Sequence, residues 1–174
     1  MSLNGLRVAL LAENEYEDLE LHYPLLRLRE AGAEVVVVGT SVATFLSKHG
    51  YPVKADVTGD EVSADQFAGV VVPGGFAPDR LRRYPSILKL VRESHQQGKV
   101  VAAICHAGWV LASAGILKGK RVTSTPGIKD DMINAGATWL DQEVVVDGQM
   151  VTSRRPDDLP AFCREIIALL EDGR

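Results

Sequence analysis

The chain has 174 residues, enough for one domain with a sizeable hydrophobic core. Its formal net charge of -4 argues against electrostatic capture by nucleic acid or by an anionic membrane surface. No apolar run approaches the length of a transmembrane helix, and the first residues, MSLNGLR, lack the apolar segment of a signal peptide. The two cysteines, Cys105 and Cys163, form neither a disulfide framework nor a C-x-x-C metal or redox motif. We therefore expect one domain over residues 1–174, located in the reducing cytoplasm, with no cofactor and no metal.

The first elements form a strand, a helix and a second strand. Leu6–Ala12 is a short continuous apolar run, which predicts a buried strand. The acidic segment ENEYEDLE then opens a helix that reaches about Ala31, and Pro24 inside it predicts an irregular first turn with a regular helix from Pro24 onward. Glu34–Gly39 is the second predicted strand. Strand, helix and strand within roughly thirty residues make a right-handed βαβ unit.

The rest of the chain continues this alternation of strands and helices. Further buried strands are predicted at Phe67–Pro73, Val100–Ile104 and Lys118–Ser124, helices at Ser86–Gln97, 109–114, 128–137 and Leu159–Leu170, and hairpins at 41–60 and Glu143–Ser153. Such alternation predicts a doubly wound, mostly parallel, flavodoxin-like three-layer α/β sandwich. In these sheets the ligand site lies beyond the carboxyl ends of the strands.

Cys105 stands between the predicted strand Val100–Ile104 and the helix that follows it. A side chain at a sharp strand-to-helix turn projects at the carboxyl edge of the sheet, where unpaired N–H groups and the helix dipole favour a thiolate. A cysteine after an apolar strand is more often a small core residue, but α/β hydrolases expose their nucleophile at such an elbow. We therefore predict that Cys105 is the reactive thiol. Cys163, on the apolar side of the last predicted helix, is predicted to serve packing.

A cysteine nucleophile also needs a group that moves its proton and donors for the oxyanion that forms on the substrate. Gly74-Gly75 closes a buried strand at the same edge, so the backbone N–H groups of Gly75 and His106 are the candidate donors. All four histidines lie at or before the elbow: His22, His49, His95 and His106. The distant His-x-Glu of a glutaminase triad is therefore absent. His106 or an acid of the first loop remains as the proton carrier, and the alternative for His106 is a helix-start residue without a catalytic role.

Long strings distributed along the chain share the pattern of a known family: NEYEDLEL, KHGYPV, VVPGGFAPDRLR, AICHAG, TSTPGIKDDMINAGATW and EVVVDGQMVTSRRPDDL. Together they resemble the PfpI-type intracellular protease branch of the ThiJ/PfpI family over nearly the whole chain. This resemblance implies a class I glutamine amidotransferase-like fold. In that family the elbow reads A-x-C-H-G-P, whereas this chain has Ala107-Gly108 where Gly-Pro is common.

The resemblance also implies partners for Cys105. In the family a glutamate from the first loop lies beside the cysteine sulfur, and by alignment this residue is Glu17. The branch also completes a Cys-His-acid triad with an acid from the neighbouring subunit. The matching position is Asp79, one methylene shorter than the glutamate usual there. The implied catalytic group is therefore Cys105, His106, Glu17 and Asp79, in a homo-oligomer of dimers or larger assemblies.

Three activities follow from the resemblance, and all use the same thiolate: peptide hydrolysis, conversion of methylglyoxal or of early glycation adducts, and protection against stress. We predict a stress-related cysteine enzyme that takes a small aldehyde or a peptide as its substrate. The intracellular peptidase and the glyoxalase or protein deglycase activity are both left open, and neither a nucleic acid nor a membrane is expected as a partner. The alternative is a non-enzymatic redox sensor or chaperone-like protein that acts through oxidation of Cys105.

Overall fold

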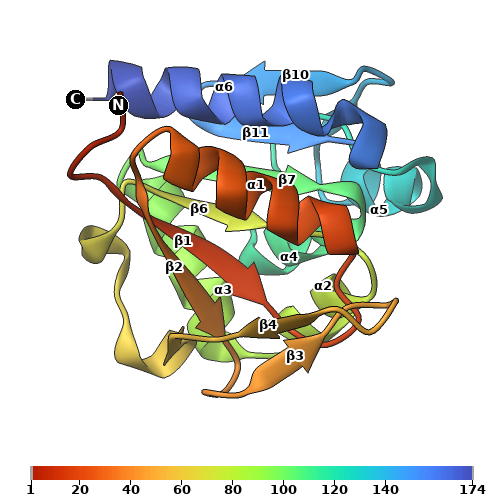
Figure 1. The fold of residues 1–174 in the computed structure, drawn as a ribbon. Helices are drawn as coiled ribbons and strands as arrows, with labels where there is room; N and C mark the ends of the chain where they lie inside the picture. The colour runs from red at the N-terminus through yellow and green to blue at the C-terminus, as the bar shows by residue number, and fades with distance from the viewer. Residues whose placement is uncertain (1, 174) are drawn as a thin grey trace.

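The structure is a computed structural model that describes residues 2–173. A seven-stranded sheet runs through its centre, with helices on both faces (Figure 1). The order across this sheet is β10 (Val144–Asp147), β11 (Met150–Ser153), β7 (Val100–Ile104), β6 (Gly69–Val72), β1 (Arg7–Ala12), β2 (Glu34–Gly39) and β5 (Val57–Thr58). Every neighbouring pair is parallel except the hairpin of β10 and β11. The predicted doubly wound, flavodoxin-like sandwich is confirmed.

Two helical layers cover the sheet. Helices α1 (Asp18–Glu30) and α6 (Leu159–Asp172) pack side by side on one face, and α3 (Pro85–Gln96) and α4 (Gly108–Ala114) pack against each other on the other face (Figure 1). The short α2 (Ala77–Leu81) contacts α4. The central strands are buried along nearly their full length, which explains why they are continuous apolar runs rather than alternating ones. No helix within residues 2–173 is long and apolar enough to span a bilayer.

Smaller elements lie around this framework. A hairpin of β3 (Thr44–Leu46) and β4 (Pro52–Lys54) forms one small sheet, and β8 (Arg121–Val122) pairs with β9 (Thr138–Trp139) in another. Helix α5 (Lys129–Asn134) packs beside α4 and β9. The 3-10 helices are η1 (Gly59–Glu61), η2 (Ala64–Gln66), η3 (Cys105–Ala107), η4 (Pro126–Ile128) and η5 (Pro156–Asp158).

Two predictions about elements were wrong. The predicted strand Lys118–Ser124 is reduced to the two residues of β8, outside the main sheet, because Gly119 adopts a positive φ of 76° and turns the chain. The predicted irregular first turn of α1 is absent, since the helix runs without interruption from Asp18 through Pro24 to Glu30. The ring of Pro24 is buried together with Leu21, Leu25 and Leu28, and this packing offsets the single helical hydrogen bond that proline cannot make.

The topology brings three segments to one edge of the sheet. Strands β1 and β6 are neighbours in the sheet, and β7 lies beside β6, so their carboxyl ends form one continuous edge. The loop after β1 is tied to the loop after β6, because the Glu17 N–H donates to the Gly74 carbonyl at 3.1 Å and Tyr16 forms a bridge with Gly75. Cys105 follows β7 directly. The predicted meeting of these three segments is confirmed.

Candidate active site

Cys105 has a strained backbone conformation at the turn between β7 and the helical segment. Ile104 is extended, with φ −125° and ψ 147°, whereas Cys105 has a φ of 61°, in the left-handed region that non-glycine residues rarely adopt. The backbone then enters η3 and α4 without a break. A strained cysteine between a buried strand and a helix has the form of a nucleophile elbow. Its partly exposed side chain is therefore presented at the carboxyl edge of the sheet.

Two backbone N–H groups point at the Cys105 sulfur, one from Gly75 and one from His106. Gly75 reaches this position with a φ of 78°. A Cβ atom there would lie 2.4 Å from the Glu15 carbonyl oxygen and 2.5 Å from the Glu17 nitrogen, so only glycine fits. The structure thus places both sequence-predicted N–H donors beside the sulfur. Their action on an oxyanion remains a prediction.

The imidazole of His106 turns back toward the preceding residue. Its Nδ1 atom lies 3.3 Å from the Cys105 sulfur, within hydrogen-bonding range for sulfur. Burial of the half-buried ring, followed by the nearby charge of Lys48, lowers the pKa of His106. A ring with a lowered pKa is neutral at pH 7, so its Nδ1 can either accept the thiol proton or donate to a thiolate, depending on the tautomer.

Glu20 supplies the carboxyl group beside the sulfur. Its side chain is fully buried, one oxygen (Oε2) accepts the Gly74 N–H at 2.9 Å, and the other (Oε1) has no hydrogen-bond partner among the described residues. Burial, followed by the charge of Glu17, raises the pKa of Glu20 to about 8. The Glu20 carboxyl is therefore mostly protonated at pH 7 and interacts directly with the Cys105 side chain.

The predicted position of Glu17 beside the sulfur was wrong. Glu17 is the N-cap of α1, and its Oε2 accepts the backbone N–H of Glu20 at 2.9 Å, while its Oε1 lies 3.9 Å from Lys48 Nζ. Because α1 starts at residue 18, Glu20 lies within the first turn and faces the sheet. A sequence signal for this existed: Glu20, Pro24 and Leu28 are spaced by four residues and share the buried face of one helix. Because the helix was expected to be regular only from Pro24 onward, this spacing did not lead to a prediction for Glu20.

The expectation of a thiolate at Cys105 depends on the state of Glu20. Burial, followed by the charge of Glu20, raises the pKa of Cys105, while the N–H groups of His106 and Gly75 lower it. Cys105 and Glu20 are two acidic groups at contact distance in a buried site, so ionisation of one opposes ionisation of the other. The pair therefore loses its two protons in separate steps. When Glu20 carries its proton, its charge no longer opposes the thiolate. A protonated carboxyl beside the sulfur is thus the state in which Cys105 ionises most easily.

The remaining predicted residues lie outside this cluster. Asp79, on α2, forms an ion pair with Arg83 one helical turn away, and its described contacts include neither Cys105 nor His106. Cys163 is only 1% exposed, within the apolar side of α6, and burial raises the pKa of its thiol to about 12. The structure therefore brings together Cys105, His106 and Gly75, places Glu17 one contact further out, and leaves Asp79 on the surface.

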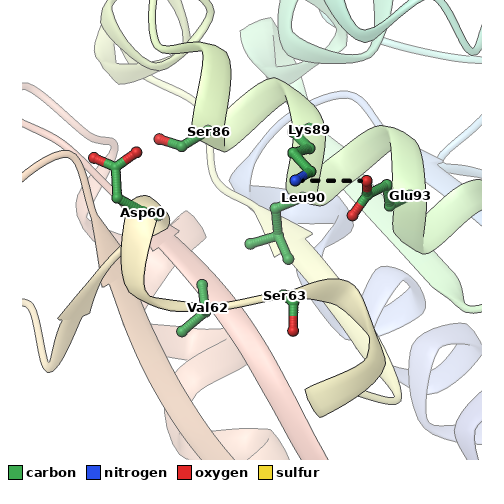
Figure 2. A pocket seen from close by; sticks show the side chains of 8 residues that line it. Asp60, Val62, Ser63, Ser86, Lys89, Leu90 and Glu93 are labelled. Carbon is green, nitrogen blue, oxygen red and sulfur yellow. Dashed lines mark ion pairs between the residues drawn. The ribbon is translucent and has the colours of Figure 1, made fainter.

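A separate cavity of about 130 Å³ lies between the η1 segment and α3 (Figure 2). Asp60, Ser63, Ser86, Lys89 and Glu93 supply its polar side chains, and Lys89 pairs with Glu93 at 3.9 Å. None of its lining residues belongs to the strand ends that carry Cys105, Gly75 or Glu20. In residues 2–173 no group of three His, Cys, Asp or Glu side chains could hold a metal ion.

The chain resembles known proteins along nearly its whole length. The model of the DJ-1/PfpI family matches residues 6–169. The chain is 49% identical over 166 residues to the deglycase PfpI of Pyrococcus furiosus, covering 95% of this chain and 100% of that protein. It is 40% identical over 166 residues to the putative cysteine protease YraA of Bacillus subtilis, covering 95% of this chain and 98% of that protein.

The fold also resembles that of a solved structure. The crystal structure of Drosophila melanogaster DJ-1beta superposes with a TM-score of 0.89 at 29% sequence identity, covering 95% of this chain and 91% of that chain. Sequence and fold comparisons therefore agree over almost the full length of the described chain.

Proposed function

The chain belongs to the DJ-1/PfpI family, and from this premise we propose that it is a stress-related cysteine enzyme of the PfpI type. Its lead activity in this proposal is the conversion of methylglyoxal and the removal of early glycation adducts. One observation carries the proposal: the strained Cys105 has a mostly protonated buried acid, a neutral imidazole and two N–H donors at its sulfur. This set suits addition to a small carbonyl group and transfer of protons around it.

The proposed reaction begins when the Cys105 sulfur adds to the aldehyde carbon. The C–S bond forms, the π electron pair of the carbonyl moves to oxygen, and the thiol proton passes to that oxygen to give a hemithioacetal. The N–H groups of Gly75 and His106, which face the sulfur before attack, are the donors for the oxygen as its charge develops. No proton or electron is lost from the site in this step.

The second stage moves one proton between adjacent carbons. His106, neutral at pH 7, takes the proton from the hemithioacetal carbon, and Glu20 protonates the oxygen that becomes charged. The proton then returns from His106 to the neighbouring carbon, while the hydroxyl proton of the hemithioacetal carbon passes to the Glu20 carboxylate. The product is a thioester of a 2-hydroxy acid, so one carbon is oxidised and the other reduced within the same molecule. Water then hydrolyses the thioester and releases lactate and the thiol. A glycation adduct is a hemithioacetal or a hemiaminal of methylglyoxal. Its C–S or C–N bond first breaks, the hydroxyl proton returns to the released thiol or amine, and the free aldehyde then follows the same steps.

The test uses methylglyoxal as substrate and lactate as product. We expect lactate formation by the wild-type chain and by Cys163→Ser, and its loss in Cys105→Ser. A casein-type substrate and a methylglyoxal-modified peptide are assayed in parallel, before and after mild peroxide treatment. Lactate formation that survives in Cys105→Ser contradicts the proposal. Absence of any turnover, together with a function that appears only after peroxide, would favour the redox sensor instead.

Peptide hydrolysis is the second candidate, supported by the 3.3 Å contact between Cys105 and His106. In this proposal Asp79 of a neighbouring subunit orients His106, and the shorter aspartate side chain makes that reach demanding. Asp79→Ala is then expected to lower peptide hydrolysis and to leave alkylation of Cys105 unchanged. Equal hydrolysis by both proteins would remove Asp79 from the catalytic group.

The Asp79 proposal requires a homo-oligomer. Large apolar side chains are exposed on α1, on the hairpin and next to α2, and Leu26, Tyr51 and Phe76 are 64%, 59% and 63% exposed. Surfaces of this kind are typical of subunit contacts. We expect light scattering to give a dimer or a larger assembly at assay concentration, and a monomer would contradict the shared triad. The free thiol of Cys105 also supports the proposed location in the reducing cytoplasm.

A further inference from the structure

Trp109 lies one helical turn after His106 and contacts its ring. His106 is in η3 and Trp109 is in the first turn of α4, so the two side chains are three residues apart and share one face of the helical segment. Their ring centroids are 5.1 Å apart and the ring planes are tilted by 57°, which is a direct aromatic contact. Because His106 Nδ1 lies 3.3 Å from the Cys105 sulfur, a continuous series of contacts links Trp109 to the nucleophile.

The indole of Trp109 is held in place by two other segments. Its Nε1–H donates to Asp131 Oδ2, on α5, at 3.0 Å. The guanidinium of Arg82, which follows α2, lies 5.6 Å from the centroid of the indole ring, within range of a cation–π interaction. Arg82 is anchored to α4 as well, since its Nε donates to Ser113 Oγ at 2.9 Å. These contacts fix the plane of the half-buried indole.

The imidazole of His106 needs such a constraint. To reach the sulfur of the preceding residue it must turn back, and two side-chain torsions allow it to turn away again. Its described ring contacts are the hydrogen bond to Cys105 and the indole of Trp109, and neither involves a carboxylate. Contact with a fixed indole limits the rotation that a single hydrogen bond to sulfur leaves open.

We propose that Trp109 is the positioning residue of His106, whose fixed indole keeps Nδ1 of the imidazole turned toward the Cys105 sulfur. The acid of a Cys-His-acid triad orients its histidine by charge, whereas this constraint is a packed ring of the same subunit. An uncharged orienting group leaves the imidazole neutral at pH 7, while a carboxylate in contact with it would raise its pKa. The proton transfer by His106 rests on the proposed function, but the effect of its orientation on the sulfur can be measured without turnover.

A double-mutant cycle on the alkylation of Cys105 by iodoacetamide provides this measurement. In the reaction the sulfur attacks the CH₂ group, a C–S bond forms, iodide leaves and the thiol proton passes to His106 or to solvent. Trp109→Leu is made in the wild-type chain and in His106→Gln, and mass spectrometry of the Cys105 peptide gives the rate constants at pH 7. If Trp109 acts through His106, its replacement matters only while the imidazole is present.

Trp139→Leu is the matched control for the loss of an indole. Trp139 is half-buried like Trp109, its Nε1–H donates to Ser124 Oγ at 3.0 Å, and the Lys129 ammonium lies 5.2 Å from its ring centroid. The described contacts of its ring do not include His106. Its replacement therefore removes the same kinds of contact without touching the elbow.

Asp131→Ala and Asp130→Ala keep the proposal testable if Trp109→Leu does not fold. Both acids are exposed neighbours on α5, and of the two only Asp131 has a described hydrogen bond to the indole of Trp109. Asp131→Ala releases the indole and should lower the alkylation rate constant about two- to threefold, again only while His106 is present. Asp130→Ala removes the same charge and should leave the rate constant unchanged. Equal rates in Asp131→Ala and Asp130→Ala contradict the proposal.

We expect Trp109→Leu to lower the alkylation rate constant about tenfold in the wild-type chain and by less than about twofold in His106→Gln. On methylglyoxal the loss should appear in kcat with KM nearly unchanged, and Trp109→Phe, which keeps a ring, should restore most of it. An unchanged rate in Trp109→Leu, equal falls in the two backgrounds or an equal fall in Trp139→Leu overturns the positioning role. The expected coupling without lactate formation by the wild type supports that role and contradicts only the proposed function, so the two failures are distinguishable.

Discussion

Cys105 and Cys163 show what separates a reactive thiol from a structural one. Cys163 lies on the apolar side of α6 beside Phe162 and Ile166. Burial raises its pKa to about 12 and outweighs the charge of Arg27, which lowers it. Cys105 is also largely removed from water, but it ends a strand at the sheet edge, where N–H groups and the Glu20 carboxyl reach its sulfur. A thiol that is buried without hydrogen-bond donors stays protonated and is inert. Where donors reach the buried sulfur, they stabilise the thiolate, so the pKa of the thiol depends on its neighbours.

The largest expected effect concerns the two thiols themselves. Cys105→Ala should lower turnover by at least about a thousandfold, because no other group can form the covalent intermediate. Cys163→Ala should retain activity and lose only about 1 kcal/mol of stability through the small cavity it creates. Iodoacetamide at neutral pH, followed by peptide mapping, checks the same contrast in the wild type. Labelling of Cys163 as fast as Cys105 would contradict the assignment of Cys105 as the reactive thiol.

The second prediction compares the effects of replacing Glu20 and Glu17 on turnover and on stability. Glu20→Gln keeps a donor and fills the same space, but it removes the proton that the carboxyl supplies, so kcat/KM should fall about 10²- to 10⁴-fold. Glu17→Gln alters only the N-cap of α1 and should cost about 1 kcal/mol of stability with little change in turnover. Steady-state kinetics on methylglyoxal and urea unfolding of both variants measure this. A larger kinetic loss in Glu17→Gln would return the proton-carrying role to Glu17.

A third prediction concerns the pH dependence of the free energy of unfolding. Among the residues of the elbow, Glu20 should make the largest contribution to it. Its folded-state pKa, about 8, lies above the ordinary carboxyl value of 4.5, so the folded chain holds a proton that the unfolded chain releases. This contribution is fully present below about pH 4.5 and is lost as the pH rises through 8. Urea unfolding at pH 5, 6.5 and 8.5 should show a fall of a few kcal/mol in the wild type and a flatter profile in Glu20→Gln. Identical profiles would contradict a protonated Glu20.

The last comparison concerns the backbone around the sulfur, where we expect the smallest effect on activity. Gly75→Ala combines a positive φ with the clash against the Glu15 carbonyl, so it should cost about 3 kcal/mol and slow the alkylation of Cys105. Gly119→Ala is the matched control, since it has nearly the same φ of 76° and no atom within 4 Å of the added Cβ. It should cost only about 1–2 kcal/mol and leave alkylation unchanged. Equal effects at both positions would show that the close approach to the loop is unimportant.

Local sequence patterns were sufficient for most of the framework. Val100–Ile104 is a continuous apolar run and became a strand with those same bounds, because a strand buried on both faces needs apolar side chains at every position. Asp147-Gly148 likewise predicted the hairpin that joins β10 and β11. The prediction for Lys118–Ser124 was wrong because the chain turns at Gly119, and the remaining strand β8 pairs with β9, a partner distant in the sequence, rather than with the main sheet.

The doubly wound fold, the elbow at Cys105 and the location of Gly75 and His106 beside it were predictable from sequence patterns, since each depends on residues adjacent to the end of a strand. The identity of the acid beside the sulfur depends instead on how the chain packs. Glu17 and Glu20 differ by three residues, and the start of α1 turns one toward the helix N-terminus and the other into the core. The proton on Glu20 and the ion pair between Lys48 and Glu17 are likewise consequences of packing. Burial and distance set the strength of electrostatic interactions, and both depend on contacts between residues that are separated in the sequence.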